Sequence, residues 1–448
     1  MGADGLCLAV IGEARVRVLH LLGWYFPESV GGTEVYVAEL ARRQRAQGWE
    51  VAVAAPDADA RDIRTVEWDG SRVFRYPLDS ADREFAALVD RLRPDVVHVH
   101  SLVTGVGLPQ LIAARQTARR VLFTAHLPAL GFICQRGSLL RWGREACDGL
   151  RDVHRCASCA LEHRGVPQAW AGTIARIGEA AGPLARVVPS RLGAALRMPA
   201  RIATNGEWQR QLLDLVDWFV VLNRRAQEIV LSNGAPRDKV VLNRLATGIR
   251  AIPKPRPLAS PTNAPVRIGF VGRLHEAKGI DVLLRAFAMV DRHLPVTLQI
   301  IGPMGADDPE RMSRLLRTAL EADPRISFTG SVDRSGVDAA LRQLDVLCCP
   351  SVWFENGPTI ALEAQAIGTP VIGSVIGAIP EIVADGRNGR LFPPGDAAAL
   401  ADVLRSLAHD PAQVDNWREA LPSPRTMDDV AADYQSLYGM VDLAVAHG

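Results

Sequence analysis

Residues 353–381 read WFENGPTIALEAQAIGTPVIGSVIGAIPE, and this stretch decides the fold of the chain. We expect a helix that begins at Pro358, where the missing N–H group of proline is tolerated, and that ends at Gly368. An apolar strand is expected at 369–373, and the turn at 377–381 opens a second helix. Helix, strand and helix in close succession are typical of an α/β fold with a parallel sheet.

The start of the first of these helices has the properties of a phosphate site. A helix that begins after a glycine turn presents free N–H groups and the positive end of its dipole to an anion. Thr359 and Glu363 are four residues apart and share a face, so Glu363 would lie near a ribose if Thr359 lay over a diphosphate. Glu355 lies just before the helix, where it could accept hydrogen bonds from sugar hydroxyls. Together these residues indicate a nucleotide-sugar site.

A second element, residues 266–279, supplies positive charge. It reads VRIGFVGRLHEAKG, in which an apolar strand ends at Gly272 and is followed by Arg273 and Lys278. The spacing lets the two cations converge on one diphosphate, Arg273 as a bidentate fork and Lys278 as a point charge. The chain has only three lysines, so a lysine at this position is hard to attribute to chance.

These motifs resemble the retaining family 4 glycosyltransferases of the GT-B fold, the glycosyl transferases group 1. The resemblance rests on four patterns: G-R-x4-K-G at 272–279, E-x7-E at 355–363, E-A-x-A-x-G-x-P-V at 363–371 and G-x-x-P-E at 377–381. It implies an α/β chain of two doubly wound Rossmann-like domains that face a central cleft. The donor would bind to the C-terminal domain, and the acceptor would enter over the N-terminal domain.

The resemblance also implies which residues form the site. The catalytic groups would be Arg273, Lys278, Glu355 and His126, a histidine at a strand end close to the transferred sugar. The donor would contact Gly31, Gly32, Gly272, Gly302, Val332, Asn356, Gly357, Pro358, Thr359, Ile360 and Glu363.

Two parts of this assignment have plainer alternatives. Gly31 and Gly32 could simply precede a helix expected at 33–47, with Thr33 as its N-cap. The strand-end residues His98 and His100 are interpreted as structural, because a histidine at such a place is more often a packing residue than a catalyst.

The resemblance implies a reaction as well as a fold. A sugar would pass from a nucleotide-diphosphate sugar to an acceptor hydroxyl with retained configuration, without a catalytic metal or cofactor and without a separate base. Sugars or lipid-linked acceptors of polysaccharide, glycolipid or glycoconjugate synthesis are expected. The alternatives are a non-catalytic nucleotide-sugar-binding scaffold and a nucleotide-sugar epimerase of the same fold.

The expected organisation places the N-terminal domain at 1–250 and the C-terminal domain at 266–426. The proline-rich stretch 251–265 between them is interpreted as a linker. The last segment, 427–448, is expected to form a helix that returns to the N-terminal domain.

An insertion in the N-terminal domain is expected at about 131–210, and it contains four cysteines. Cys134, Cys147, Cys156 and Cys159 are spaced C-x12-C-x8-C-x2-C. Such ligands suit a structural zinc ion, which would hold together an insertion too short to bury a core of its own. An iron–sulfur cluster and free thiols are the alternatives.

Composition limits the remaining classes. The 448-residue chain has 48% hydrophobic residues and a net charge of +1, which argues against a nucleic-acid-binding protein. The sequence has neither an apolar run of membrane length nor the basic start of a signal peptide, so we expect a cytoplasmic protein. Residues 136–210 carry twelve arginines and six acidic residues, a local charge of +6. This patch suits contact with the inner face of a membrane or a lipid-linked acceptor, although a solvated face is the more ordinary explanation.

Overall fold

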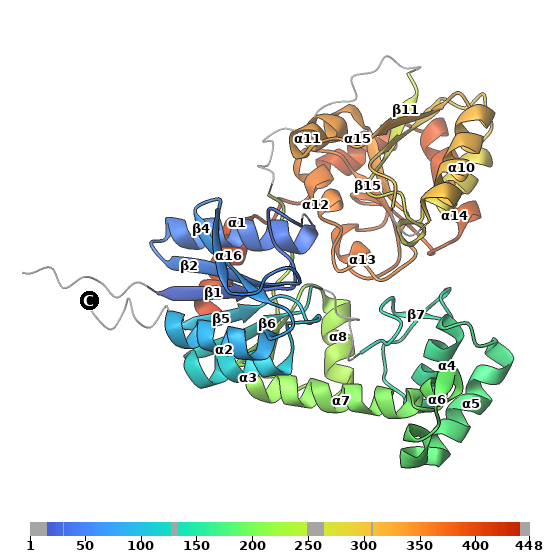
Figure 1. Ribbon diagram of the computed structural model, residues 1–448. Helices are drawn as coiled ribbons and strands as arrows, with labels where there is room; N and C mark the ends of the chain where they lie inside the picture. The colour runs from blue at the N-terminus through green and yellow to red at the C-terminus, as the bar shows by residue number, and fades with distance from the viewer. Residues whose placement is uncertain (1–15, 30, 127–132, 249–263, 306–307, 440–448) are drawn as a thin grey trace, which may run out of the picture. The chain divides into compact units, whose positions relative to one another are not determined.

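The computed structural model describes residues 16–29, 31–126, 133–248, 264–305 and 308–439 (Figure 1). The chain forms two compact units, Met1–Phe123 and Thr124–Gly448. It contains two large sheets and one short hairpin. The α/β class and the GT-B type of architecture expected from the sequence are confirmed.

The first sheet has eight strands in the order β10-β9-β6-β5-β1-β2-β4-β3. Pairs β1–β2, β1–β5, β2–β4, β5–β6 and β9–β10 are parallel, and β3–β4 is antiparallel. Its strands are β1 Arg17–Leu21, β2 Glu50–Asp57, β3 Arg64–Trp68, β4 Ser71–Pro77, β5 Val96–Val99, β6 Arg120–Thr124, β9 Trp218–Val221 and β10 Val240–Leu242. Its flanking helices are α1 Gly32–Ala46, α2 Ala81–Leu92, α3 Leu108–Thr117 and α8 Arg224–Ser232.

The second sheet has six parallel strands in the order β13-β12-β11-β14-β15-β16. They are β11 Val266–Val271, β12 Val296–Ile301, β13 Ile326–Gly330, β14 Val346–Cys349, β15 Val371–Ser374 and β16 Gly389–Phe392. The helices are η2 Glu276–Lys278, α9 Ile280–Ala288, α10 Pro309–Ala322, α11 Arg334–Gln343, α12 Thr359–Ala366, α13 Ile379–Ile382, α14 Ala397–His409 and α15 Ala412–Glu419.

One face of the second sheet packs against α9 and α14 in a shared apolar core. The sequence of α9, IDVLLRAFA, explains its orientation, because Ile280, Leu283 and Phe287 are buried while Asp281 and Arg285 form a surface ion pair.

The strand order of the second sheet creates a topological switch point. The chain runs outward from β11 to β12 and β13, then returns to β14 on the other side of β11. Loops that leave the carboxyl ends of β11 and β14 therefore diverge and leave a crevice, where open α/β sheets bind ligands. The loops that carry Arg273 and Glu355 are the two at this switch point.

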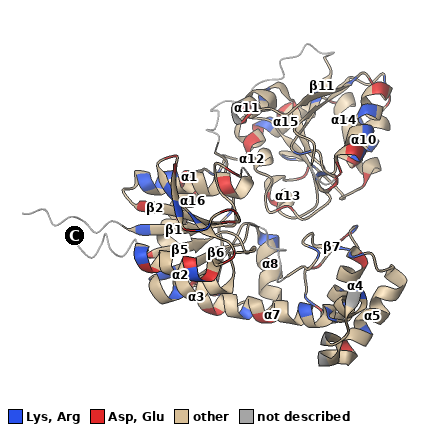
Figure 2. Ribbon diagram, viewed as in Figure 1, with Lys and Arg blue, Asp and Glu red and all other residues tan. Residues whose placement is uncertain are grey.

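A largely helical region lies between β6 and β9. It contains the short hairpin β7 Leu140–Arg141 and β8 Glu145–Ala146, followed by α4 Val153–His163, α5 Gln168–Ala181, η1 Gly182–Arg186, α6 Ser190–Leu196 and α7 Met198–Leu215. Figure 2 shows Lys and Arg on these helices and also on helices of both sheets. The interpretation of the local arginine excess as a membrane-facing patch stays a prediction.

Several boundaries differ from those expected from the sequence. Thr33 is not the N-cap of α1, because the cap is Gly31, which makes no side-chain hydrogen bond. Pro358 is the N-cap of α12 and not its first residue. The expected linker, 251–265, lies almost wholly outside the described residues, so that boundary stays a prediction.

The last helix, α16 Met427–Leu437, is shorter than 427–448, and residues 440–448 lie outside the described part. It is fixed at two points: Tyr434 shares a hydrogen bond of 2.9 Å with Thr124, and the indole N–H of Trp218 donates to the carbonyl of Leu437 at 3.0 Å. None of the helices in the described ranges combines the length and apolar character that a bilayer crossing requires.

Candidate active site

A buried ion pair lies at the switch point of the second sheet. Lys278 Nζ donates to Glu355 Oε1 at 2.7 Å. The same oxygen accepts from the hydroxyl of Ser351 at 2.6 Å and from the indole N–H of Trp353 at 3.1 Å. Only 8% of the Glu355 side chain is exposed, against 27% for Lys278, so the lysine is the more accessible partner of the pair. Glu355 Oε2 accepts no hydrogen bond from the described residues.

The backbone holds Glu355 in place. The N–H of Ala378 donates to the carbonyl of Glu355 at 2.8 Å. Gly377 next to it has φ +57°, and a Cβ atom there would lie 2.1 Å from the same carbonyl oxygen. Only glycine allows this approach, which explains the first residue of the G-x-x-P-E motif.

A similar approach fixes Lys278. Gly279 has φ +69°, and a Cβ atom there would lie 1.8 Å from the carbonyl oxygen of Pro350 at the end of β14. In addition, the N–H of Val352 donates to the carbonyl of Ala277 at 3.0 Å. The loops after β11 and β14 are therefore joined through their backbones, and the Lys278–Glu355 pair bridges them.

Arg273 is the second cation of this edge. It follows Gly272 directly after β11 and is exposed. Its guanidinium has no hydrogen-bond or ion-pair partner in the part of the chain that the structure describes. Gly302, after β12, lies against the backbone of Gly272. A Cβ atom at Gly302 would lie 1.9 Å from the carbonyl oxygen of Gly272. This edge is consequently lined by backbone and by the side chains of Lys278 and Arg273.

The turn before α12 contains Asn356, Gly357 and Pro358, as the sequence indicates. Thr359 opens the helix and is exposed, whereas Glu363, one turn later, is 3% exposed. Ile360 is half-buried and packs against an apolar cluster that includes Leu347 and Ile379. Val332, by contrast, lies at the far side of the sheet, in the loop after β13.

The glycine pair of the first sheet lies at the start of α1. A Cβ atom at Gly31 would lie 2.6 Å from Glu34 Oε2, whereas Gly32 has no atom within 4 Å of that position. Glu34 is buried, and its Oε1 accepts a hydrogen bond of 2.9 Å from the hydroxyl of Ser29. A carboxylate therefore lies at the helix start that the resemblance assigns to the diphosphate, and the sequence analysis did not single it out.

The strand-end histidines of the first sheet are buried. Burial lowers the pKa of His126 to about 3, so its imidazole is neutral. His20 contacts His100 Nε2 through Nδ1 at 2.9 Å and Gln44 Oε1 through Nε2 at 2.8 Å. Among the described residues, His20, His98 and His100 are the one trio of such side chains whose ligand atoms lie within 4.8 Å of one another. Both ring nitrogens of His20 are already engaged, which agrees with the structural interpretation of His98 and His100.

Sequence reasoning missed Ser351 and Trp353, although both lie within four residues of Glu355. The only available signal was this proximity, since neither residue belongs to the patterns that carry the resemblance.

Two family models match the chain. The one described as Glycosyl transferases group 1 matches residues 265–410, and the Glycosyl transferase 4-like domain matches residues 31–163. The chain belongs to the group 1 glycosyltransferases. Both matched ranges include expected site residues. The N-terminal match also includes all four cysteines, so the description of their segment as an insertion stays a prediction.

Curated relatives of this glycosyltransferase include D-inositol 3-phosphate glycosyltransferase of Streptomyces avermitilis. The two are 29% identical over 392 residues, which cover 85% of this chain and 76% of the relative. Phosphatidyl-myo-inositol mannosyltransferase of Mycobacterium leprae is 39% identical over 140 residues, 31% of this chain and 36% of the relative.

Solved structures agree on the fold. Sucrose-phosphate synthase from Thermosynechococcus elongatus superposes with a TM-score of 0.63 at 20% identity and covers 96% of this chain and 100% of its own. HepE from Anabaena in complex with UDP-glucose gives a TM-score of 0.55 at 14% identity, over 96% of this chain and 99% of its own.

Proposed function

We propose that this glycosyltransferase moves a sugar, with retained configuration, from a nucleotide-diphosphate sugar to an acceptor hydroxyl. The observation that carries the proposal is the Lys278–Glu355 pair, 2.7 Å long, at the switch point of the second sheet. A purely structural ion pair would gain little from leaving 27% of its lysine side chain exposed beside Arg273, which is exposed and has no partner among the described residues. A diphosphate bound at this edge explains both features.

The main barrier is the departure of a doubly charged leaving group. The cations of this edge lower that barrier because they stabilise the negative charge of the leaving group. Lys278 uses one of its three N–H donors on Glu355 and keeps two for phosphate oxygens. Arg273 adds a guanidinium fork, and the free N–H groups of α12 at Thr359 add the positive end of a helix dipole. Such preorganised charges stabilise the transition state more than the ground state.

The carboxylates are assigned to the sugar part of the donor. Glu355 Oε2 accepts no hydrogen bond from the described residues and can accept one from a hydroxyl of the transferred sugar. Glu363, buried one turn into α12, is assigned to the ribose. Gly302 and Val332 would border the nucleotide, and His126, with its pKa lowered by burial, would donate or accept a hydrogen bond as a neutral imidazole.

The proposed step needs neither a separate base nor a catalytic metal. The bond between the anomeric carbon and the diphosphate oxygen breaks, and a bond to the acceptor oxygen forms on the same face. The proton of the acceptor hydroxyl passes to the departing diphosphate. Lys278 and Arg273 stabilise the phosphate charge, which a divalent metal ion does in other enzymes.

The acceptor is proposed to be a polyol, a sugar or a lipid-linked sugar. Two relatives, a D-inositol 3-phosphate glycosyltransferase and a phosphatidyl-myo-inositol mannosyltransferase, support hydroxyl acceptors of these kinds. A lipid-linked acceptor would bring the chain to a membrane surface during the reaction.

Calorimetric titration with UDP, GDP and ADP tests the donor site directly. We expect one diphosphate to bind wild type, and Lys278→Ala and Arg273→Ala each to weaken that binding at least tenfold. With the matching sugar donor, turnover in Lys278→Ala should fall by about 10²–10³. Arg285→Ala, which removes an exposed arginine on the neighbouring α9, is the matched control and should bind normally.

Equal binding by wild type and Lys278→Ala would contradict the assignment. Retention is tested by following the anomeric configuration of the product by NMR, and metal independence by turnover in excess EDTA. An epimerase would convert the donor sugar without acceptor, and a scaffold would bind the diphosphate without turnover.

A further inference from the structure

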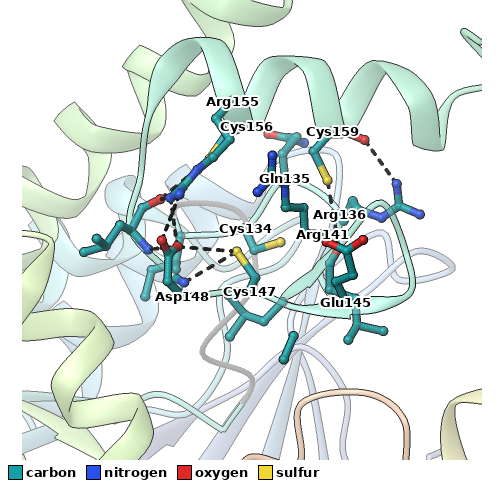
Figure 3. A pocket seen from close by; sticks show the side chains of 16 residues that line it. Cys134, Gln135, Arg136, Arg141, Glu145, Cys147, Asp148, Arg155, Cys156 and Cys159 are labelled. Atoms are coloured by element: carbon teal, nitrogen blue, oxygen red, sulfur yellow. Dashed lines mark hydrogen bonds and ion pairs between the residues drawn. The ribbon is translucent and has the colours of Figure 1, made fainter. Parts of the chain in front are cut away.

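The four cysteines between β6 and α5 come from three different pieces of chain. Cys134 lies in the loop before the β7–β8 hairpin, Cys147 follows β8, and Cys156 and Cys159 lie on α4. The last two are three residues apart and share a helix face. All four are half-buried free thiols that line one pocket (Figure 3). In Figure 3 the sulfur atoms of Cys134, Cys147 and Cys159 turn toward the same hollow.

Two arginines hold the cysteine loops against α4. Arg155, next to Cys156, donates to both carboxylate oxygens of Asp148, next to Cys147, at 2.8 Å each. Arg136, two residues after Cys134, donates to the carbonyl of Cys159 at 3.1 Å. Each arginine therefore links a loop that carries a cysteine to α4.

Backbone N–H groups point at two of the sulfur atoms of this pocket. The backbone N–H of Trp142 donates to Cys159 Sγ at 3.3 Å, and that of Gly149 donates to Cys147 Sγ at 3.5 Å. Hydrogen bonds to a charged sulfur stabilise the charge, and such outer contacts orient metal ligands. The side chain of Arg155 lines the same pocket. This cation would partly offset the net negative charge that four thiolates would leave around a divalent ion.

The hairpin is short, and Leu140 of β7 is buried in an apolar cluster with Leu347 and Ile379. Strands β7 and β8 have two residues each, and an isolated hairpin is marginally stable at best. The apolar cluster below α4 contains four alanines among its seven buried residues: Ala157, Ala160, Leu161, Ala171, Ala175, Met198 and Ile202. A core this small stabilises little, which is the situation in which small protein modules use a metal.

We propose that Cys134, Cys147, Cys156 and Cys159 bind one structural Zn²⁺ ion, which joins the β7–β8 hairpin to α4. Four thiolates in a tetrahedral, closed set are the ligands of structural zinc. No three of these sulfur atoms lie within 4.8 Å of one another. Binding therefore requires rotation of the cysteine side chains toward the pocket centre, while the contacts of Arg136 with the Cys159 carbonyl and of Arg155 with Asp148 can stay in place.

The test is the metal content of the full-length protein purified without chelator, measured by ICP-MS. We expect one zinc per wild-type chain, and less than a tenth of that in Cys156→Ser and in Cys159→Ser. Cys348→Ala removes a thiol buried in β14, away from the pocket, and should keep its zinc. Replacement of zinc by Co²⁺ in the wild type should give the visible absorption of a tetrahedral cobalt–thiolate centre.

Several results would overturn the proposal. These are a wild-type chain without zinc, iron with the absorption of an iron–sulfur cluster, or cysteine pairs found as disulfides by mass spectrometry. Zinc that persists in both serine variants, or a cobalt spectrum without thiolate character, would place the metal elsewhere, for example at His20. The cobalt spectrum and the zinc content of the wild type decide the matter even if the variants fold poorly.

Discussion

Glu355 differs from an ordinary ion-pair partner because one of its oxygens accepts three hydrogen bonds, whereas the other accepts none from the residues that the structure describes. Oε1 accepts from Lys278, Ser351 and Trp353, which together fix the carboxylate. A neutral glutamine could keep these three hydrogen bonds, since its carbonyl oxygen is an acceptor of the same shape. The charge of Glu355 can therefore be removed with little change in geometry.

The substitution Glu355→Gln should move binding and turnover in opposite directions. Loss of the carboxylate leaves the charge of Lys278 unopposed, so affinity for the nucleoside diphosphate should rise about three- to tenfold. Turnover should fall at least tenfold, because the amide holds a sugar hydroxyl less strongly than a carboxylate does. Calorimetry with the diphosphate and initial rates with the sugar donor measure the two effects.

The control for this substitution is Glu310→Gln, which removes an exposed carboxylate on α10. It should change neither affinity nor turnover. A Glu355→Gln variant that binds the diphosphate more weakly than wild type would show that the carboxylate does not oppose Lys278 in the donor site.

At the scale of elements, the site depends on how closely loops approach one another. The G-x-x-P-E turn before α13 touches the backbone of Glu355, and the Lys278–Gly279 turn before α9 touches the end of β14. The ion pair is therefore positioned by backbone contacts between three loops, and side-chain contacts complete it.

Gly377→Ala should separate this steric effect from simple backbone strain. An added Cβ atom meets the carbonyl oxygen of Glu355 at 2.1 Å, so the loop must shift and turnover should fall at least tenfold. Gly395→Ala is the matched control, because its φ of +79° carries a similar strain but no atom lies within 4 Å. Both variants should lose about 1–2 kcal/mol of stability from the left-handed conformation. The explanation fails if their turnover numbers are equal.

The sequence predicted the elements of the second sheet better than the contacts between them. Apolar runs and glycine or proline boundaries placed β11, β12, β14 and β15 within about two residues, because local patterns determine where strands and helices occur. The roles of Ser351 and Gly377 depend on approaches between separate loops, which no local pattern records. Similarly, Pro358 caps α12 instead of entering it, a difference of one residue that local preferences do not resolve.

At the scale of the whole molecule, buried neutral histidines link folding to pH. Burial lowers the pKa of His20 to about 4, an effect that the hydrogen bond to Gln44 only partly offsets, and lowers that of His126 to about 3. The titratable neighbours of His20 are His98 and His100. Folding therefore keeps at least two imidazoles neutral in a pH range where the unfolded chain would protonate them.

The sign of this linkage is that stability falls as the pH falls. With folded values near 3–4 and an unfolded value near 6.5, the unfolded state binds more protons below about pH 6.5. Each of the two histidines should therefore remove about 2 kcal/mol between pH 7 and pH 5. Urea unfolding at the two pH values measures the loss.

His20→Gln should be less stable than wild type at pH 7 but should show a smaller further loss of unfolding free energy at pH 5. His293→Gln, at an exposed position, should retain the full wild-type loss. If wild type and His20→Gln lose the same free energy between pH 7 and pH 5, then His20 is not the group that couples folding to protonation.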